Sequence, residues 1–311
     1  MIEQFLAALI NNRDSQLRAW MGEELMRVKG EQYLNSIIPY ITDEVRASGY
    51  HGAFYIEGAV PKDYLWKCLE MPSGKKLIAV INFMGLDLGK PFIRVMAIEP
   101  LLESIGELEA LAAFLKAEFF MFSPPRICVF DGLGKFSEET ERLKFDMWNV
   151  AAPLNVIREV KFDVSQQLRL EKAVNLDFYE WYEREYHLFL EEHPAHKIWL
   201  QLTKREEFQG MIEEETCYLC FLGDLRIGLI AAEYQEEKFL TGYCVYEELI
   251  VQTHRGKGYG KQMQQLMIRE LPIRDEQDLL WGTIDSGNKI SLRTAMACGR
   301  KKLGKWIYFN T

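Results

Sequence analysis

Hydrophobic and polar positions alternate at helical spacing from the first residue to about Arg46, and short apolar runs separated by turns follow. Residues 77–83 and 92–98 are β-branched apolar runs on either side of a turn at 85–91, which predicts a hairpin. The rest of the first half predicts a helix from Pro100 to about Phe120, a strand at 126–130, a polar helix at 137–148 and a joint at 151–153.

The second half repeats this kind of order with more strands. It predicts strands at 155–162, 168–173, 217–222, 227–234, 243–251, 279–283 and 305–310, and helices at 176–192, 198–213, 259–270 and 289–298. The fold class is therefore α+β with mixed strands. A length of 311 residues predicts two domains, and the joint places them at 1–152 and 153–311.

The net charge, the charge pattern and the cysteine positions exclude several classes of protein. A net charge of -9 argues against a nucleic-acid partner, since such proteins carry a clustered basic excess. The apolar start lacks a basic segment and a cleavage site, and residues 101–122 contain too many charges for a membrane span. The six scattered cysteines predict free thiols, including the Cys217 and Cys220 pair, which lacks a second metal half-site. We expect a cytoplasmic protein with no membrane partner and no metal.

One glycine-rich segment carries the candidate chemistry. A β-branched strand ends at Val251, and Arg255-Gly-Lys-Gly-Tyr-Gly260 leads into an amphipathic helix. Glycines let the backbone amides face outward, and a helix N-terminus favours an anion. Lys257 and Lys261 add positive charge, so the segment predicts a diphosphate site. Neither a P-loop nor a dinucleotide fingerprint fits the spacing.

Residues 255–260 resemble the pyrophosphate motif of the GCN5-related N-acetyltransferase (GNAT) superfamily, and Asn288, Ser291 and Gly299 resemble that family's second motif. The resemblance implies a GNAT-like mixed sheet with two splayed strands, flanked by helices, and acetyl-CoA as co-substrate. It implies that the coenzyme contacts Leu249, Ile250, Val251, Arg255, Gly256, Lys257, Gly258, Tyr259, Gly260, Lys261, Asn288 and Ser291. One backbone amide near Ile250 would face the thioester oxygen, and two amide donors there would make an oxyanion site.

The same resemblance implies direct attack of a neutral amine on the thioester, with a carboxylate on the first splayed strand to take the proton. Glu247 and Glu248 are the candidates, and Glu248 shares the strand parity of Ile250 unless a bulge intervenes. The alternative is that both face solvent and water carries the proton. Ala295 stands where the family has a tyrosine acid, and Arg300 replaces an aromatic residue; Tyr243 or Tyr246 is a candidate substitute.

The acceptor is expected to contact the aromatic and acidic helix near 178–192, where Tyr182 and Tyr186 share one face. Its glutamates either attract a cationic amine or form a solvated face. The histidines at 51, 187, 193, 196 and 254 have no metal-ligand spacing. The partner would be a small-molecule or peptide amine.

The first half parallels the second in element order, but it has Glu99-Pro-Leu-Leu-Glu-Ser-Ile-Gly106 where the glycine turn would lie. It is interpreted either as a degenerate GNAT-like copy without a coenzyme site, serving as scaffold, homodimer surface or cleft wall, or as an unrelated α/β domain. Three readings follow: an N-acetyltransferase, an acyl-CoA-binding sensor with weak or no catalysis, and an adaptor.

Overall fold

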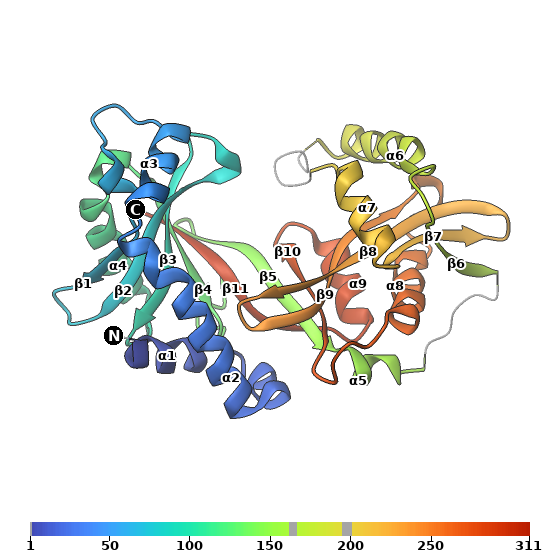
Figure 1. Ribbon diagram of the computed structural model, residues 1–311, viewed down its shortest axis with the longest axis horizontal. Helices are drawn as coiled ribbons and strands as arrows, with labels where there is room; N and C mark the ends of the chain where they lie inside the picture. Colours follow the sequence, from blue (N-terminus) through green and yellow to red (C-terminus); the bar gives the residue numbers. More distant parts are fainter. Residues whose placement is uncertain (1, 162–166, 195–200) are drawn as a thin grey trace. The chain divides into compact units, whose positions relative to one another are not determined.

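The computed structural model describes residues 2–161, 167–194 and 201–311 (Figure 1). The chain divides into two compact units, one formed by Met1–Trp148 and Leu303–Thr311, and the other by Asn149–Lys302. Strands β5 (Leu143–Pro153) and β11 (Lys301–Asn310) each contribute residues to both units. The last nine residues of the chain therefore belong to the first unit.

The first unit, called unit 1 below, opens with helices and continues as a mixed sheet. Its strands follow the order β1-β2-β3-β4-β11, in which β3 and β4 are parallel and the other neighbours are antiparallel. The elements are α1 (Ile2–Asn11), α2 (Ser15–Ile37), α3 (Glu44–Ala53), β1 (Lys67–Glu70), β2 (Lys76–Phe83), β3 (Pro91–Glu99), α4 (Ile105–Glu118) and β4 (Arg126–Asp131).

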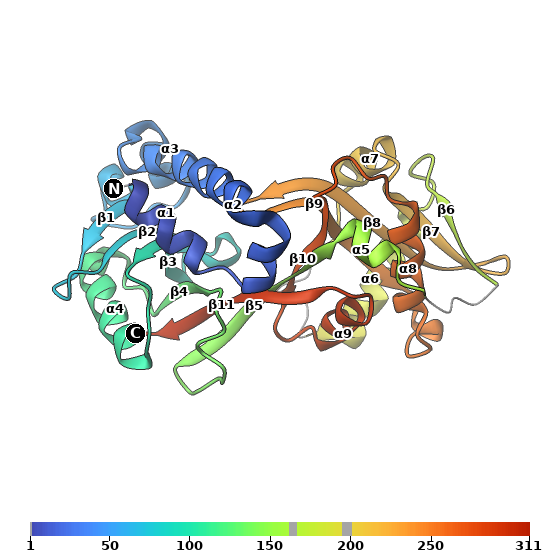
Figure 2. The same ribbon diagram turned by 90° about the horizontal axis from the view of Figure 1, so that it is seen from below.

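Helices cover both faces of this sheet (Figure 2). Helix α4 buries Leu108, Leu111 and Leu115, which lie three and four residues apart and pack on the inward residues of β2, β3 and β4. Strand β11 supplies Ile307 and Phe309 to this core, and its alternate residues pack in an aromatic cluster on the opposite face. The C-terminal strand is thus a structural part of unit 1.

A buried ion pair fastens β11 to β4. Lys305 Nζ lies 3.0 Å from Asp131 Oδ2, and each side chain is only 3% exposed. The Asp131 carboxylate also accepts hydrogen bonds from the amides of Lys135 and Phe136. These donors satisfy the buried carboxylate, which otherwise would carry a large desolvation cost.

The second unit, called unit 2 below, contains the glycine-rich segment. Its strands follow the order β10-β9-β8-β7-β6, with β9 and β10 parallel and the other pairs antiparallel. The elements are α5 (Leu154–Arg158), β6 (Leu168–Lys172), α6 (Tyr179–Glu192), α7 (Arg205–Glu213), β7 (Cys217–Leu222), β8 (Leu225–Glu237), β9 (Leu240–Ile250), α8 (Tyr259–Glu270), β10 (Leu279–Asp285) and α9 (Lys289–Ala297).

The two faces of this sheet carry different helices. Buried side chains of α6 and α7 cluster with Cys217, Leu229 and Leu249 on one face. Helix α8 lies on the other face, where a side-chain atom built on Gly228 would meet Ile250 and Met263. Because side chains alternate along a strand, odd-numbered residues from 247 to 249 of β9 face α6, and Glu248 and Ile250 face α8.

Units 1 and 2 share an internal arrangement. In each, an antiparallel hairpin leads to a helix and then to a strand parallel to the hairpin's second strand. Each hairpin also has a bulge near the end of its second strand, at Met96 in β3 and at Tyr246 in β9. A shared bulge is a feature that element order alone would not produce, and it supports the interpretation of unit 1 as a copy of the same fold.

Two predicted elements were wrong. No helix forms at 137–148: residues 137–142 are irregular and 143–148 are the first half of β5, because backbone pairing across the sheet outweighs local propensity there. The strand predicted at 155–162 begins as helix α5, whose Leu154 and Ile157 are both buried at a spacing of three residues. The predicted helix at 198–213 is observed from Arg205, and residues 198–200 lie outside the described residues. The proposed joint at 151–153 is the end of β5.

Lys305→Met should destabilise the protein by about 3 kcal/mol, because it leaves the buried Asp131 carboxylate without its cation. Urea unfolding at pH 7 measures the change. Lys90→Met is the matched control, since Lys90 pairs with Asp87 on the surface, with 56% and 48% of the two side chains exposed. An equal effect of both substitutions would contradict the importance of the buried pair.

Candidate functional site

Strands β9 and β10 separate part-way along their length. Their parallel pairing covers Leu279 with Gly242, Leu280 with Tyr243 and Trp281 with Cys244. Strand β9 then continues for six residues to Ile250, and β10 continues to Asp285, without further paired residues between them in the described part of the chain. The remaining length of β9 therefore has an edge that β10 does not cover.

The glycine-rich turn follows directly on this open edge. Gly256 and Gly258 have φ values of 74° and 80°, in the left-handed region that glycine adopts without strain. Gly258 is the N-cap of α8, and neither glycine has an atom within 4 Å of the position of an added side chain. Within the described residues, no acceptor is assigned to the amides of Gly256 to Lys261. The turn thus presents a row of donors at the positive end of a helix.

One backbone amide of β9 points into the open edge. Val251 donates its amide to Ile227 of β8 at 2.9 Å, so alternation directs the backbone groups of Ile250 to the other side. The Ile250 carbonyl accepts from Arg255 Nε at 2.7 Å on that side. The amide of Glu248 has the same orientation but already donates to Glu247 Oε1 at 2.9 Å. Within the described part of β9, the Ile250 amide therefore has no assigned acceptor on this side and is available to a ligand.

Glu248 lies between the open edge and α8. Its Oε2 accepts a hydrogen bond from Gln264 Nε2 at 2.7 Å. Its Oε1 lies 3.1 Å from the position where a side chain on Gly260 would begin, so the carboxylate and the start of α8 are closely packed there. The bulge at Tyr246 precedes Glu247, and Glu248 therefore keeps the parity of Ile250.

Glu247 faces α6 and is fully occupied. Its Oε2 accepts from the Tyr182 hydroxyl at 2.6 Å and from Thr203 Oγ1 at 3.0 Å, while Oε1 accepts from the Glu248 amide. The Thr203 amide donates to the Tyr182 hydroxyl, which completes the network. Three donors hold Glu247 as a structural acceptor beneath the aromatic helix.

The two glutamates also differ in their titration. Burial raises the pKa of Glu248 to about 7, against the lowering effects of the Gln264 hydrogen bond and the Arg300 charge. Burial also raises the pKa of Glu247, and its three hydrogen bonds oppose that rise. A carboxyl with a pKa near 7 and a single donor is well suited to accept a proton at neutral pH.

Asn288 and Ser291 lie at the start of α9. The Asn288 side chain is the N-cap and accepts from the Ser291 amide at 3.1 Å. This bond gives the pair a structural role beside the expected contact with a coenzyme. Ala295 is fully buried in the same helix, and it supplies no acid at that position.

The aromatic helix is tied to the glycine turn. Arg255 Nη1 lies 3.3 Å from Glu192 Oε2, and the guanidinium stacks over the Phe189 ring. Tyr182 and Tyr186 share the buried face, as predicted, with 0% and 3% exposure. Glu192 is therefore engaged by Arg255 and does not form part of a freely solvated acidic face.

The two tyrosines considered as acids have other partners. Tyr243 is buried and accepts from Arg274 Nε at 3.2 Å. Tyr246 donates to Glu207 at 2.8 Å, and burial raises its pKa to about 12. The described residues contain no cluster of histidine, cysteine or carboxylate groups that could hold a metal ion, and His196 lies outside them.

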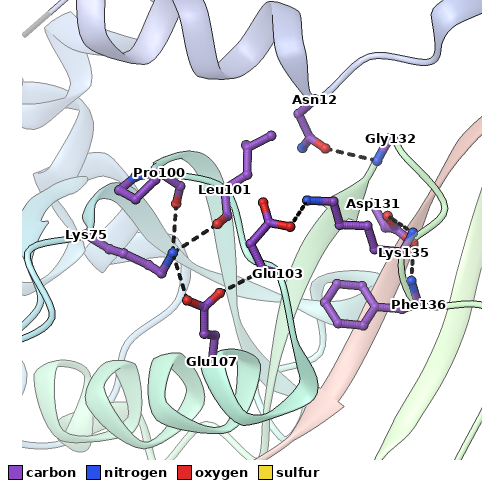
Figure 3. Close-up of polar contacts among 10 residues, drawn as sticks. All are labelled: Asn12, Lys75, Pro100, Leu101, Glu103, Glu107, Asp131, Gly132, Lys135 and Phe136. Carbon is purple, nitrogen blue, oxygen red and sulfur yellow. Dashed lines mark hydrogen bonds and ion pairs between the residues drawn. The ribbon is translucent and has the colours of Figure 1, made fainter.

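The corresponding position of unit 1 is filled by the protein's own side chains (Figure 3). Glu107, in the first turn of α4, accepts from the Glu103 amide at 2.6 Å and lies 3.2 Å from Lys75 Nζ. Lys75 also donates to the Leu101 carbonyl, and Ser104 caps the helix. The Glu103 amide bond holds the pKa of Glu107 below its ordinary value, so this helix end already carries a carboxylate.

Comparison with solved structures identifies the fold. A GCN5-related N-acetyltransferase from Sphaerobacter thermophilus matches 82% of this chain and 82% of its own, with a TM-score of 0.50 and 13% identity. The fold is that of the GCN5-related N-acetyltransferases. A GNAT-family acetyltransferase from Colwellia psychrerythraea covers 75% of this chain and 80% of its own at a TM-score of 0.48 and 9% identity. A tandem GNAT protein from the clavulanic acid biosynthesis pathway covers 87% and 96% at 0.43 and 13%.

No family model and no curated protein matches the sequence. The GNAT fold therefore rests on three-dimensional similarity together with the splayed strands and the glycine turn. None of the described helices has the length and apolar character needed to cross a membrane.

Three contributors to the site were not identified from the sequence. Thr203 precedes α7, Gln264 lies on the buried side of α8, and Arg300 was noted only as an unusual residue after Gly299. The one available signal was Gln264, a polar residue beside Met263 and Met267 on the apolar face of the helix.

Glu248→Gln should become more stable than the wild type as the pH rises from about 4.5 to about 7. A raised folded-state pKa contributes stability that is present at low pH and is lost as the pH passes through that folded pKa, and glutamine does not titrate. We expect a relative gain of about 1–3 kcal/mol from urea unfolding at pH 8 compared with pH 4.5. A difference that does not change with pH would contradict the raised pKa.

Proposed function

We propose that the protein is an acetyl-CoA-dependent N-acetyltransferase that acetylates an amine by direct attack on the thioester. The observation that carries this proposal is the position of the Glu248 carboxyl beside the edge of β9 that β10 does not cover. This edge leads directly into the glycine turn and its row of backbone amides, and the pKa of Glu248 is about 7. A diphosphate suits the amides, and an extended thioester arm suits the strand edge.

In this proposal the turn from Arg255 to Lys261 binds the pyrophosphate, and the edge from Leu249 to Val251 binds the pantetheine arm. The amide of Ile250 donates to the thioester oxygen as negative charge develops on it. Asn288 and Ser291 border the arm at the start of α9. The open left-handed turn at Gly256 and Gly258 and the orientation of the Ile250 backbone toward the uncovered edge support these assignments.

The acetyl transfer then takes a simple course. The amine nitrogen bonds to the carbonyl carbon, the carbon–sulfur bond breaks with its electron pair remaining on sulfur, and the proton of the amine passes to Glu248, directly or through water. The coenzyme leaves as a thiolate, whose ordinary pKa near 8.5 allows departure without a tyrosine at position 295. We assign the base to Glu248 because Glu247 is held by three donors.

The proposed acceptor is a small-molecule or peptide amine. The second candidate function is an acyl-CoA sensor with weak catalysis, which the buried Ala295 favours.

Unit 1 is proposed to act as a scaffold without its own coenzyme site, since Glu107 would repel a diphosphate at α4. Homodimer formation and a cytoplasmic location stay predictions.

Lys261→Glu should weaken acetyl-CoA binding by about tenfold or more, because it places negative charge beside the diphosphate. Calorimetric titration of acetyl-CoA measures this. Arg269→Glu is the matched control, with the same change of charge in the last turn of the same helix. Absence of binding to the wild type would reject both the transferase and the sensor.

Glu248→Gln should bind acetyl-CoA as the wild type does and lose about 10²–10⁴-fold in the rate of thiol release with an accepted amine. In the wild type, the rate should increase as the pH rises through about 7, because the protonated carboxyl cannot accept a proton. A panel of primary amines with a thiol-detecting reagent provides the assay. Tight binding without turnover by any amine would favour the sensor.

A further inference from the structure

Arg300 is a buried cation that directly contacts no carboxylate among the described residues. Its side chain follows Gly299 at the end of α9 and is 2% exposed. No ion pair is assigned to it within the described residues, and its buried Nε atom has no hydrogen-bond partner. An isolated buried charge is costly, so its presence calls for a compensating role.

Gln264 connects Arg300 to Glu248. Arg300 Nη2 donates to Gln264 Oε1 at 2.7 Å, and Gln264 Nε2 donates to Glu248 Oε2 at 2.7 Å. The glutamine is 1% exposed, so water does not compete for these bonds. The three side chains, which we call the Arg300 relay, come from the end of α9, from α8 and from β9.

The chemistry of arginine fixes the direction of the relay. A guanidinium only donates, so Gln264 must turn its carbonyl oxygen toward Arg300. Its amide group is then directed at Glu248, and the Oε2 atom of that carboxyl must accept. A proton on Glu248 is consequently restricted to Oε1, the atom that lies against Gly260 in the first turn of α8.

We infer that Arg300 and Gln264 are positioning residues that hold Glu248 with Oε1 as its proton-accepting atom and that set the pH range in which Glu248 is ionised. This inference rests on the proposed function for its catalytic part only. Neither residue touches the proposed substrates; each acts through Glu248.

The charged and titratable groups around Glu248 support a specific role for Arg300. Glu247 precedes it on β9, Cys298 lies near it at the end of α9, and Arg300 is the cation that acts on it. Burial disfavours a negative charge on Glu248, and the charge of Glu247 does so too, whereas the Cys298 thiol is neutral in the pH range where Glu248 ionises. Arg300 and the Gln264 bond oppose these effects and keep the pKa of Glu248 near neutrality.

The test compares Arg300→Met, Arg300→Lys and Gln264→Met with the wild type, each with and without Glu248→Gln. In the wild-type background, the stability gained by Glu248→Gln appears as the pH passes through the pKa of Glu248. In the Arg300→Met and Gln264→Met backgrounds, the same gain should appear about one pH unit higher. Arg300→Lys, which keeps the charge, should move it less. Urea unfolding from pH 4.5 to pH 9 provides this readout without any need for turnover.

The pH dependence of the rate of thiol release should shift upward by the same amount. In Arg300→Met the rate at pH 6.5 should fall by about tenfold and recover at pH 8.5, which corresponds to one unit of displacement. Arg13→Met is the control, since Arg13 is a buried arginine of unit 1, and it should leave the Glu248 titration unchanged while destabilising the protein. A uniform loss of rate at every pH would indicate a merely structural role and overturn the inference.

Failure of the two proposals can be told apart. If the wild type neither binds acetyl-CoA nor releases thiol, the proposed function fails, and the stability readout still decides the relay. If the wild type turns over but the Glu248 titration is the same in Arg300→Met, Gln264→Met and the wild type, the relay is rejected and the proposed function stands.

Discussion

The separation of β9 from β10 after Cys244 and Trp281 is the constraint on which the candidate site depends. Paired strands would use the amide of Ile250 in a ladder, and a ligand would have no backbone to bond. The separation exposes that amide, and the glycine turn that follows β9 exposes another row of donors. A single break in pairing thus creates an edge that leads to a helix N-terminus, which is a geometry for an extended molecule with an anionic end.

Glu247 and Glu248 have different roles because they lie on opposite faces of β9. Glu247 points to α6 and uses its oxygens to hold Tyr182, Thr203 and the backbone of Glu248. Glu248 points to α8 and has one donor, so its burial is less compensated and its pKa is raised to about 7. Neighbouring residues of one type therefore acquire different chemistry because strand alternation places them in different surroundings.

The glycine turn, the boundaries of α8 and the parity of Glu248 could be predicted from the sequence, because short-range patterns determine each of them. Gly256 and Gly258 require left-handed backbone, and Met263 and Met267 mark a buried helical face. The strand β5 could not be predicted as one, because its pairing involves β10 and β11, which lie far away in the sequence. The link from Arg300 to Gln264 spans 36 positions and likewise leaves no local pattern.

Unit 1 shows what happens to the same geometry when the chemistry of the turn changes. It keeps the hairpin, the bulge and the helix after β3, but Glu107 and Lys75 form an internal ion pair at the helix N-terminus. The Glu107 carboxylate interacts favourably with the positive end of the helix dipole. An external anion could bind there only after this carboxylate had been removed. Strand β11 stabilises unit 1 through the core residues Ile307 and Phe309 and the buried pair of Lys305 with Asp131. Because that strand also begins in unit 2, directly after Arg300, a chain shortened before Leu303 would lose part of the unit 1 core while retaining the relay residues of unit 2.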